Sequence, residues 1–134
     1  MNTISKKVFI QKIHLFISVL IVIPIAIVYG FEPQSQFDIF PETNDEHNFF
    51  KAIMGLYLSF SFLWVLGILK DNYLKTALIS NMIFMLGLAF GRILSFITNG
   101  NPSLGFQLGT FGELLIGFYG IWILTNKNSS FAKK

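Results

Sequence analysis

Four long apolar segments occupy most of the sequence and constrain its fold more than any other feature. They run over about residues 8–28, 49–69, 74–97 and 106–124. A helix needs about 20 predominantly apolar residues to cross the hydrocarbon core of a bilayer, and each segment is close to that length. We therefore predict an all-α fold, a four-helix transmembrane bundle in which consecutive helices are antiparallel neighbours.

The composition supports the same interpretation. Of the 134 residues, 53% are hydrophobic and only 13% are charged, and the mean hydropathy is +0.61. Soluble domains average about 25% charged residues, and a domain of this size buries only about two-thirds of its surface. We therefore predict one integral-membrane domain over residues 1–134 that is surrounded by membrane lipids, which are its predicted partners.

Several classes of function find no support in the sequence. There is no cysteine, so thiolate chemistry and cysteine metal sites are excluded. No basic tract is interleaved with aromatic residues, so we expect no nucleic-acid partner. His14 lies near the cytoplasmic end of the first apolar run and His47 lies in the loop at the opposite side, so they cannot share one metal ion or haem. We expect no metal, no cofactor and no enzymatic activity.

The connection over residues 30–48 is the long one of the chain. It carries five acidic residues together with Phe31, Phe37, Ile39 and Phe40, and we expect it to lie on the membrane surface with its aromatic rings at the interface. The alternative is that this connection is a flexible acidic loop. At its end, Thr43 and Glu46 have the spacing of a capping box, which predicts the start of the second spanning helix.

Lysines near the ends of spanning helices set orientation, because they stay on the cytoplasmic side. With four spans, eight lysines fall on one side: Lys6, Lys7, Lys12, Lys70, Lys75, Lys127, Lys133 and Lys134. The other side carries the acidic loop and the uncharged turn "TNGNPS". We therefore predict that both termini are cytoplasmic. An alternative is that the first segment is a signal peptide cleaved near Val28 and Gly30.

Two charged residues lie inside the apolar segments. Arg92 lies about 8 Å deep from the outer end of the third segment, and Glu113 about 10 Å deep in the fourth, at a rise of 1.5 Å per residue. The two segments are joined by a short turn, so their helices must be neighbours. A lone charge in a bilayer is costly. We therefore predict that Arg92 and Glu113 form an ion pair.

Glycines surround both charged residues. Gly109 and Gly117 lie four residues before and after Glu113, and Gly87 and Gly91 form a G-x-x-x-G pattern before Arg92. Small residues allow helix backbones to approach closely in membranes, so we predict close helix packing at these four glycines. A glycine-lined groove beside a carboxylate would also admit a ligand.

Further polar residues are expected near the same side. Tyr57 lies in the second segment, Ser95 one turn from Arg92, and Lys51 with His47 at the mouth. The functional interpretation is a small polar chamber built from Arg92, Glu113, Tyr57, Ser95 and Lys51. The structural interpretation is an ion pair that sets helix register, with the other residues at packing or solvated positions. The sequence leaves both open.

These residues resemble a known bacterial membrane family, domain of unknown function 4345. The resemblance covers about residues 45–124, from "KAIMGLYLSFSFLWVLG" through "FMLGLAFGRILSFITNGNP" to the helix that carries Glu113. The matching positions are Lys51, Ala52, Gly55, Tyr57, Gly91, Arg92, Ser95, Gly100 and Glu113. Lys51 and Asn99 depart from the pattern, which often has Arg and Asp there. The resemblance implies a four-helix protein of the bacterial cytoplasmic membrane and implies no activity.

Three functional hypotheses remain. The first is a binding or accessory protein that holds a lipid-like or small amphiphilic ligand, or a partner helix, with Arg92 orienting an anionic headgroup and Glu113 holding Arg92. The second is a small oligomeric transporter or proton-coupled carrier in which Glu113 titrates. The third is a membrane enzyme that uses Glu113 or Tyr57 as acid or base. A homo-oligomer or a membrane-protein partner is compatible with each.

Overall fold

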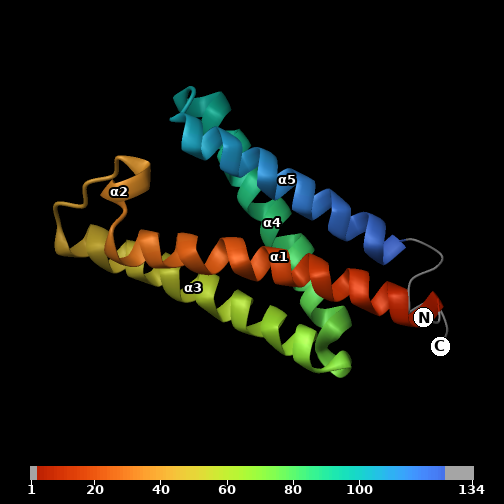
Figure 1. The fold of residues 1–134 in the computed structure, drawn as a ribbon. Helices are drawn as coiled ribbons and strands as arrows, with labels where there is room; N and C mark the ends of the chain where they lie inside the picture. Colours follow the sequence, from red (N-terminus) through yellow and green to blue (C-terminus); the bar gives the residue numbers. More distant parts are fainter. Residues whose placement is uncertain (1–2, 126–134) are drawn as a thin grey trace.

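The computed structural model describes residues 3–125, and its regular elements are all helices (Figure 1). They are α1 (Thr3–Phe31), α2 (Gln34–Phe37), α3 (Asn44–Leu69), α4 (Asp71–Asn99) and α5 (Leu104–Thr125). No strand occurs within residues 3–125. Four helices, α1, α3, α4 and α5, are long and apolar enough to cross a membrane. The prediction of a four-helix transmembrane bundle is confirmed.

The four long helices alternate in direction, so the bundle has two distinct ends. One end, here called the terminal end, is where α1 begins and α5 ends. There the start of α1 meets the turn between α3 and α4, and Lys12 Nζ lies 2.7 Å from Asp71 Oδ1. At the opposite end, here called the loop end, α2 and the turn at Gly100 connect the remaining helices (Figure 1). Three lysines used to predict orientation, Lys127, Lys133 and Lys134, lie outside the described residues.

The helices pack as two hairpins. α1 packs mainly against α3, and α4 packs mainly against α5, while contacts between α3 and α4 join the hairpins. α1 and α5 make few contacts, and Figure 1 shows them separating toward the loop end. The bundle is therefore open along one side, which we call the α1–α5 seam.

The helices extend beyond the predicted apolar runs by a few residues, because helical hydrogen bonding continues into polar flanking residues. The start of α3 is set by the predicted capping box. The Glu46 backbone N–H donates to Thr43 Oγ1 at 3.2 Å, and the Thr43 N–H donates to Glu46 Oε2 at 3.0 Å. This box satisfies two backbone groups that would otherwise lack partners at the helix start.

The buried core follows one face of each spanning helix. On α1 the buried positions recur every three or four residues, which is the period of one helix face. They are Gln11, His14, Leu15, Ser18, Val22, Ala26 and Tyr29. Trp64 of α3 and Leu78 of α4 complete the centre of the core. Many other large apolar side chains are exposed, as expected of helices whose outer faces contact lipid.

Part of the connection between α1 and α3 folds back on the bundle. Its one-turn helix α2 ends at Phe37, whose ring packs between Tyr29 of α1 and Phe106 of α5, whereas Phe31 and Phe40 are exposed. Asp38 follows in the left-handed region at φ 52°, which turns the chain away from α2. The loop end of the α1–α5 seam is thus covered by a side chain from this connection.

Only one of the four glycines predicted to pack closely does so. A Cβ atom at Gly117 of α5 would collide with the side chain of Leu86 of α4, so this glycine permits close approach of the two helices. At Gly87, Gly91 and Gly109 an added Cβ would meet no neighbouring atom within 4 Å. The prediction of close packing was wrong there. Gly87 and Gly91 lie on the exposed face of α4, and Gly109 faces a cavity.

Candidate functional site

The predicted contact between Arg92 and Glu113 is present. Arg92 Nε lies 3.0 Å from both Oε1 and Oε2 of Glu113, and the two side chains are 18% and 12% exposed. α4 and α5 bring the residues together because they are antiparallel and joined by a short turn. Each charge therefore neutralises the other inside an apolar bundle, where an isolated charge would be strongly unfavourable.

Two further side chains hold the guanidinium of Arg92. Its Nη2 donates to the hydroxyl of Tyr29 at 3.3 Å, and its Cζ lies 5.1 Å from the centre of the Phe106 ring, which is a cation–π contact. Tyr29 was not predicted from the sequence. Tyr29 lies three residues after buried Ala26 and so continues the interior face of α1.

Aromatic rings from four helices surround this end of the site. Tyr29 of α1 stacks on Phe37 of α2 with ring centres 4.7 Å apart, and Phe37 lies 4.9 Å from Phe106 of α5. Tyr57 of α3 meets Tyr29 edge to face at 5.7 Å. These rings, here called the aromatic cluster, close the loop end of the site around Arg92.

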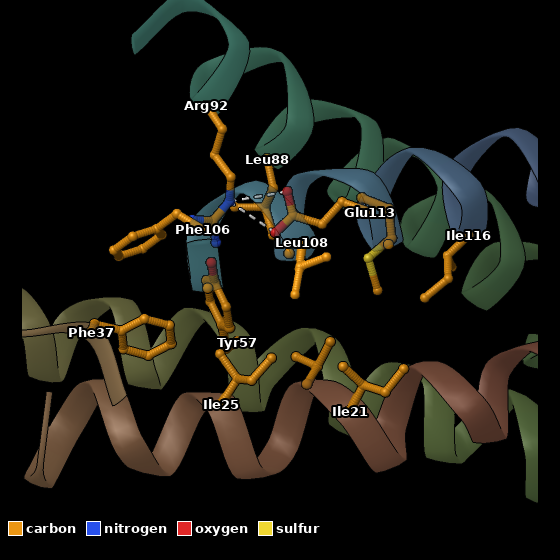
Figure 2. A pocket seen from close by; sticks show the side chains of 15 residues that line it. Ile21, Ile25, Phe37, Tyr57, Leu88, Arg92, Phe106, Leu108, Glu113 and Ile116 are labelled. Carbon is orange, nitrogen blue, oxygen red and sulfur yellow. Dashed lines mark hydrogen bonds and ion pairs between the residues drawn. The ribbon is translucent and has the colours of Figure 1, made fainter. Parts of the chain in front are cut away.

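A cavity of about 360 Å³ lies beside the ion pair and inside the α1–α5 seam. Figure 2 shows Arg92 and Glu113 on one side of it and Ile21 and Ile25 of α1 on the other. Much of its remaining lining is apolar or glycine: Val22, Met85, Leu88, Gly105, Leu108, Gly109, Gly112 and Ile116. The result is a mainly apolar space with polar groups gathered at one place.

A second cavity, of about 460 Å³, continues along the same seam. It is lined by Ile13, His14 and Ile17 of α1 and by Leu115, Ile116 and Tyr119 of α5. Ile116 lines both cavities, so the two spaces adjoin. Together they follow the seam from the aromatic cluster toward the terminal end.

The sequence matches a protein family described as Domain of unknown function (DUF4345) over residues 10–124. The chain belongs to this family. The match extends across all four spanning helices and includes both Arg92 and Glu113. Neither the curated proteins nor the solved structures contain a match to it. The DUF4345 description names no activity.

The DUF4345 fold places the predicted site residues at different distances from the cavity. Tyr57 is buried and lines it, and Figure 2 shows its hydroxyl pointing toward Arg92. Ser95 lines a shallower groove of about 220 Å³ beside Arg92 and accepts a hydrogen bond from Asn99 Nδ2 at 3.3 Å. Lys51 is exposed on α3 and does not line the cavity, so the site is less polar than the predicted chamber.

A second polar group in this DUF4345 member lies closer to the terminal end and was not predicted. His14 is buried in the bundle, and its Nε2 lies 3.0 Å from Oδ1 of Asn81. Among the described residues, Asn81 Nδ2 and Ser61 Oγ are buried without a hydrogen-bond partner. The sequence offered one indication that Asn81 is buried. Its spacing places it on the same face of α4 as Leu74, Leu78 and Met85, which are buried.

The arrangement offers little to a metal ion. Within residues 3–125, no three His, Cys, Asp or Glu side chains gather where they could hold one. The site near Arg92 instead offers hydrogen-bonding groups. The guanidinium donates, and the hydroxyls of Tyr29 and Tyr57 can both donate and accept. The cavity thus has one polar end, at Arg92, Glu113 and Tyr57, and mainly apolar walls.

Proposed function

We propose that this membrane protein binds a single-chain amphiphile in the α1–α5 seam, with the polar group beside Arg92 and the chain running toward His14. The observation that carries the proposal is the pair of adjoining cavities along one seam, with Arg92 and Glu113 at one end. Ligand sites are concave and mostly apolar, with few polar groups that fix orientation. The seam has this character and opens sideways between two spanning helices.

The length of the seam suits a hydrocarbon chain. On α1 the lining extends from Ile25 to Ile13, which is about 18 Å at 1.5 Å per residue. Much of the wall over this distance is aliphatic, with Tyr119 and His14 at its far end. Dispersion contacts would hold a chain along this aliphatic wall, where a polar headgroup would lose its hydrogen bonds.

Glycines on α5 keep the space open. Gly109 and Gly112 line the cavity, and an added Cβ at either position would meet no atom within 4 Å. Their missing side chains leave room between α5 and α1, where larger residues would project into the seam. Gly109 and Gly112 thus leave room for a ligand, whereas Gly117 allows α5 to pack closely against α4.

Photochemical cross-linking tests the proposal. The purified protein in lipid nanodiscs is incubated with lipids that carry a diazirine in the middle of one acyl chain, and labelled residues are mapped by mass spectrometry. We expect labels on the α1 and α5 residues of the second cavity, and a reduction of about tenfold in Gly109→Leu, whose side chain fills the seam. Gly87→Leu is the matched control, because Gly87 faces outward with free space around it. Equal labelling of both variants, or labels spread over all lipid-facing helices, would contradict the proposal.

A helix from a second copy or from a partner protein would compete for the same seam. The chain has no cysteine, so Ile17→Cys can be introduced alone and oxidised in membranes. Efficient disulfide dimers would show that a second copy occupies the seam, and would overturn the lipid proposal. We expect monomers.

We also propose an orientation in which the terminal end faces the cytoplasm of a bacterial cell, so that the site lies in the outer half of the cytoplasmic membrane. Support comes from the lysines at the terminal end, where Lys12 pairs with Asp71 and Lys70 lies in the turn, and from the acidic connection at the loop end.

A further inference from the structure

We infer that the amphiphile bound in the α1–α5 seam has an uncharged headgroup that exchanges hydrogen bonds, such as a hydroxyl or an ester, rather than an anionic one. The inference rests on the proposed function and specifies its ligand class. The sequence led us to expect an anionic headgroup. The structure favours an uncharged one, because the charge of Arg92 is already neutralised by Glu113.

The charges of the cavity are already balanced. Arg92 and Glu113 are the only charged residues in its described lining, and they carry opposite signs. Lys51 is exposed and does not contribute to this lining. An anionic headgroup would therefore leave a net negative charge between membrane-spanning helices, where charge is poorly solvated.

The guanidinium also has an anionic partner already. Both carboxylate oxygens of Glu113 lie 3.0 Å from Nε, and Nη2 donates to Tyr29. The ring of Phe106 lies over the guanidinium carbon at 5.1 Å. A phosphate or carboxylate bound at the Nε–Nη2 edge would displace Glu113, which would then be a buried and unpaired anion, and one bound elsewhere on the guanidinium would be a second anion beside Glu113.

A neutral headgroup requires no such displacement. A guanidinium has five N–H donors, and Figure 2 shows the Tyr57 hydroxyl pointing toward that of Arg92 from the cavity wall. A tyrosine hydroxyl both donates and accepts, so an ester carbonyl could accept from Arg92 while a hydroxyl bonds to Tyr57. The aromatic cluster would enclose such a headgroup without adding charge.

Two single-chain lipids that differ by one phosphate test the inference. Monooleoylglycerol and oleoyl lysophosphatidic acid share the chain and the glycerol, and each competes with the diazirine lipid for the seam. For the wild type we expect monooleoylglycerol to compete at least tenfold better. In Glu113→Gln, which leaves Arg92 unpaired, we expect the preference to reverse in favour of lysophosphatidic acid. Glu32→Gln is the control, because it removes the same charge from an exposed position outside the cavity.

Each outcome bears on a separate claim. If neither lipid competes, and the diazirine lipid does not label the seam, the proposed function fails. If the wild type binds lysophosphatidic acid as well as or better than monooleoylglycerol, the inference about the headgroup is wrong while the proposed function stands. If Glu113→Gln does not fold, the wild-type comparison and the neutral double variant Arg92→Gln/Glu113→Gln, expected to keep the preference for monooleoylglycerol, still decide the matter.

Discussion

Arg92 Nε and the two carboxylate oxygens of Glu113 meet at 3.0 Å across the α4–α5 hairpin, 21 residues apart in the sequence. The pair forms a neutral unit in the wall of a mainly apolar cavity. Its stability therefore depends on both partners being present, and its charge balance restricts what the cavity can bind.

The energetics of the pair can be tested with apolar replacements. Arg92→Met and Glu113→Leu each leave one buried charge without a partner, so we expect each to destabilise the fold by about 3–5 kcal/mol. The double variant removes both charges and is expected to lose much less than the sum. Reversible unfolding in mixed micelles measures this double-mutant cycle, and strictly additive losses would show that the two side chains are not coupled.

Gly117 and Gly87 are expected to respond oppositely to the same substitution. A methyl group at Gly117 collides with Leu86, so Gly117→Ala should cost about 1–3 kcal/mol through overpacking. Gly87→Ala meets no neighbour and improves helix propensity, so its stability should be unchanged or slightly higher. Thermal unfolding of both variants in the same detergent compares them. A Gly117→Ala protein as stable as the wild type would contradict the packing at this position.

The buried contact between His14 and Asn81 predicts another coupling. His14→Leu leaves the Asn81 carbonyl oxygen without its partner at 3.0 Å, and should cost about 1–3 kcal/mol. The double variant His14→Leu/Asn81→Leu removes both groups and should recover part of that loss. A double-mutant cycle measured by unfolding checks this expectation, and a coupling energy near zero would argue against the hydrogen bond.

Ser61 should tolerate removal of its hydroxyl. Its Oγ is buried with no hydrogen-bond partner among the described residues, so Ser61→Ala removes an unsatisfied group and should not destabilise the fold. A clear decrease in the midpoint of thermal unfolding would instead indicate that the hydroxyl is bonded, for example to a buried water molecule. Ser18→Ala is the comparison, because Ser18 Oγ donates to the His14 carbonyl at 3.1 Å.

Phe37 should control release of a ligand at the loop end. Its ring packs between Tyr29 and Phe106 and lines the cavity, so Phe37→Ala opens this end of the seam. We expect a fluorescent monoacylglycerol to dissociate about tenfold faster, with little change in the unfolding midpoint. Phe40→Ala makes the same chemical change at a ring that is 69% exposed, and should leave dissociation unchanged. Identical rates in both variants would show that Phe37 does not cover the site.

The sequence alone determined the number of spanning helices, the start of α3 and the contact between Arg92 and Glu113. Each of these depends on information within one segment or across one short turn. The length of the apolar runs predicts the spans, Thr43 and Glu46 form the predicted capping box, and the turn at Gly100 makes α4 and α5 antiparallel neighbours. Once two helices are held side by side, the depth of each charge follows from the helical rise.

Only the tertiary structure decided which faces of the helices meet. The rotation of α1 about its axis brings Tyr29 to Arg92 and His14 to Asn81, although these partners are 63 and 67 residues apart in the sequence. The packing of α1 against α3 rather than α5 leaves the seam open, so that Gly109 lines a cavity while Gly117 packs on Leu86. In an apolar helix almost every face can contact lipid, so hydrophobic periodicity is weak and does not indicate these rotations. The contacts that define the cavity are set by the packing of all four helices together.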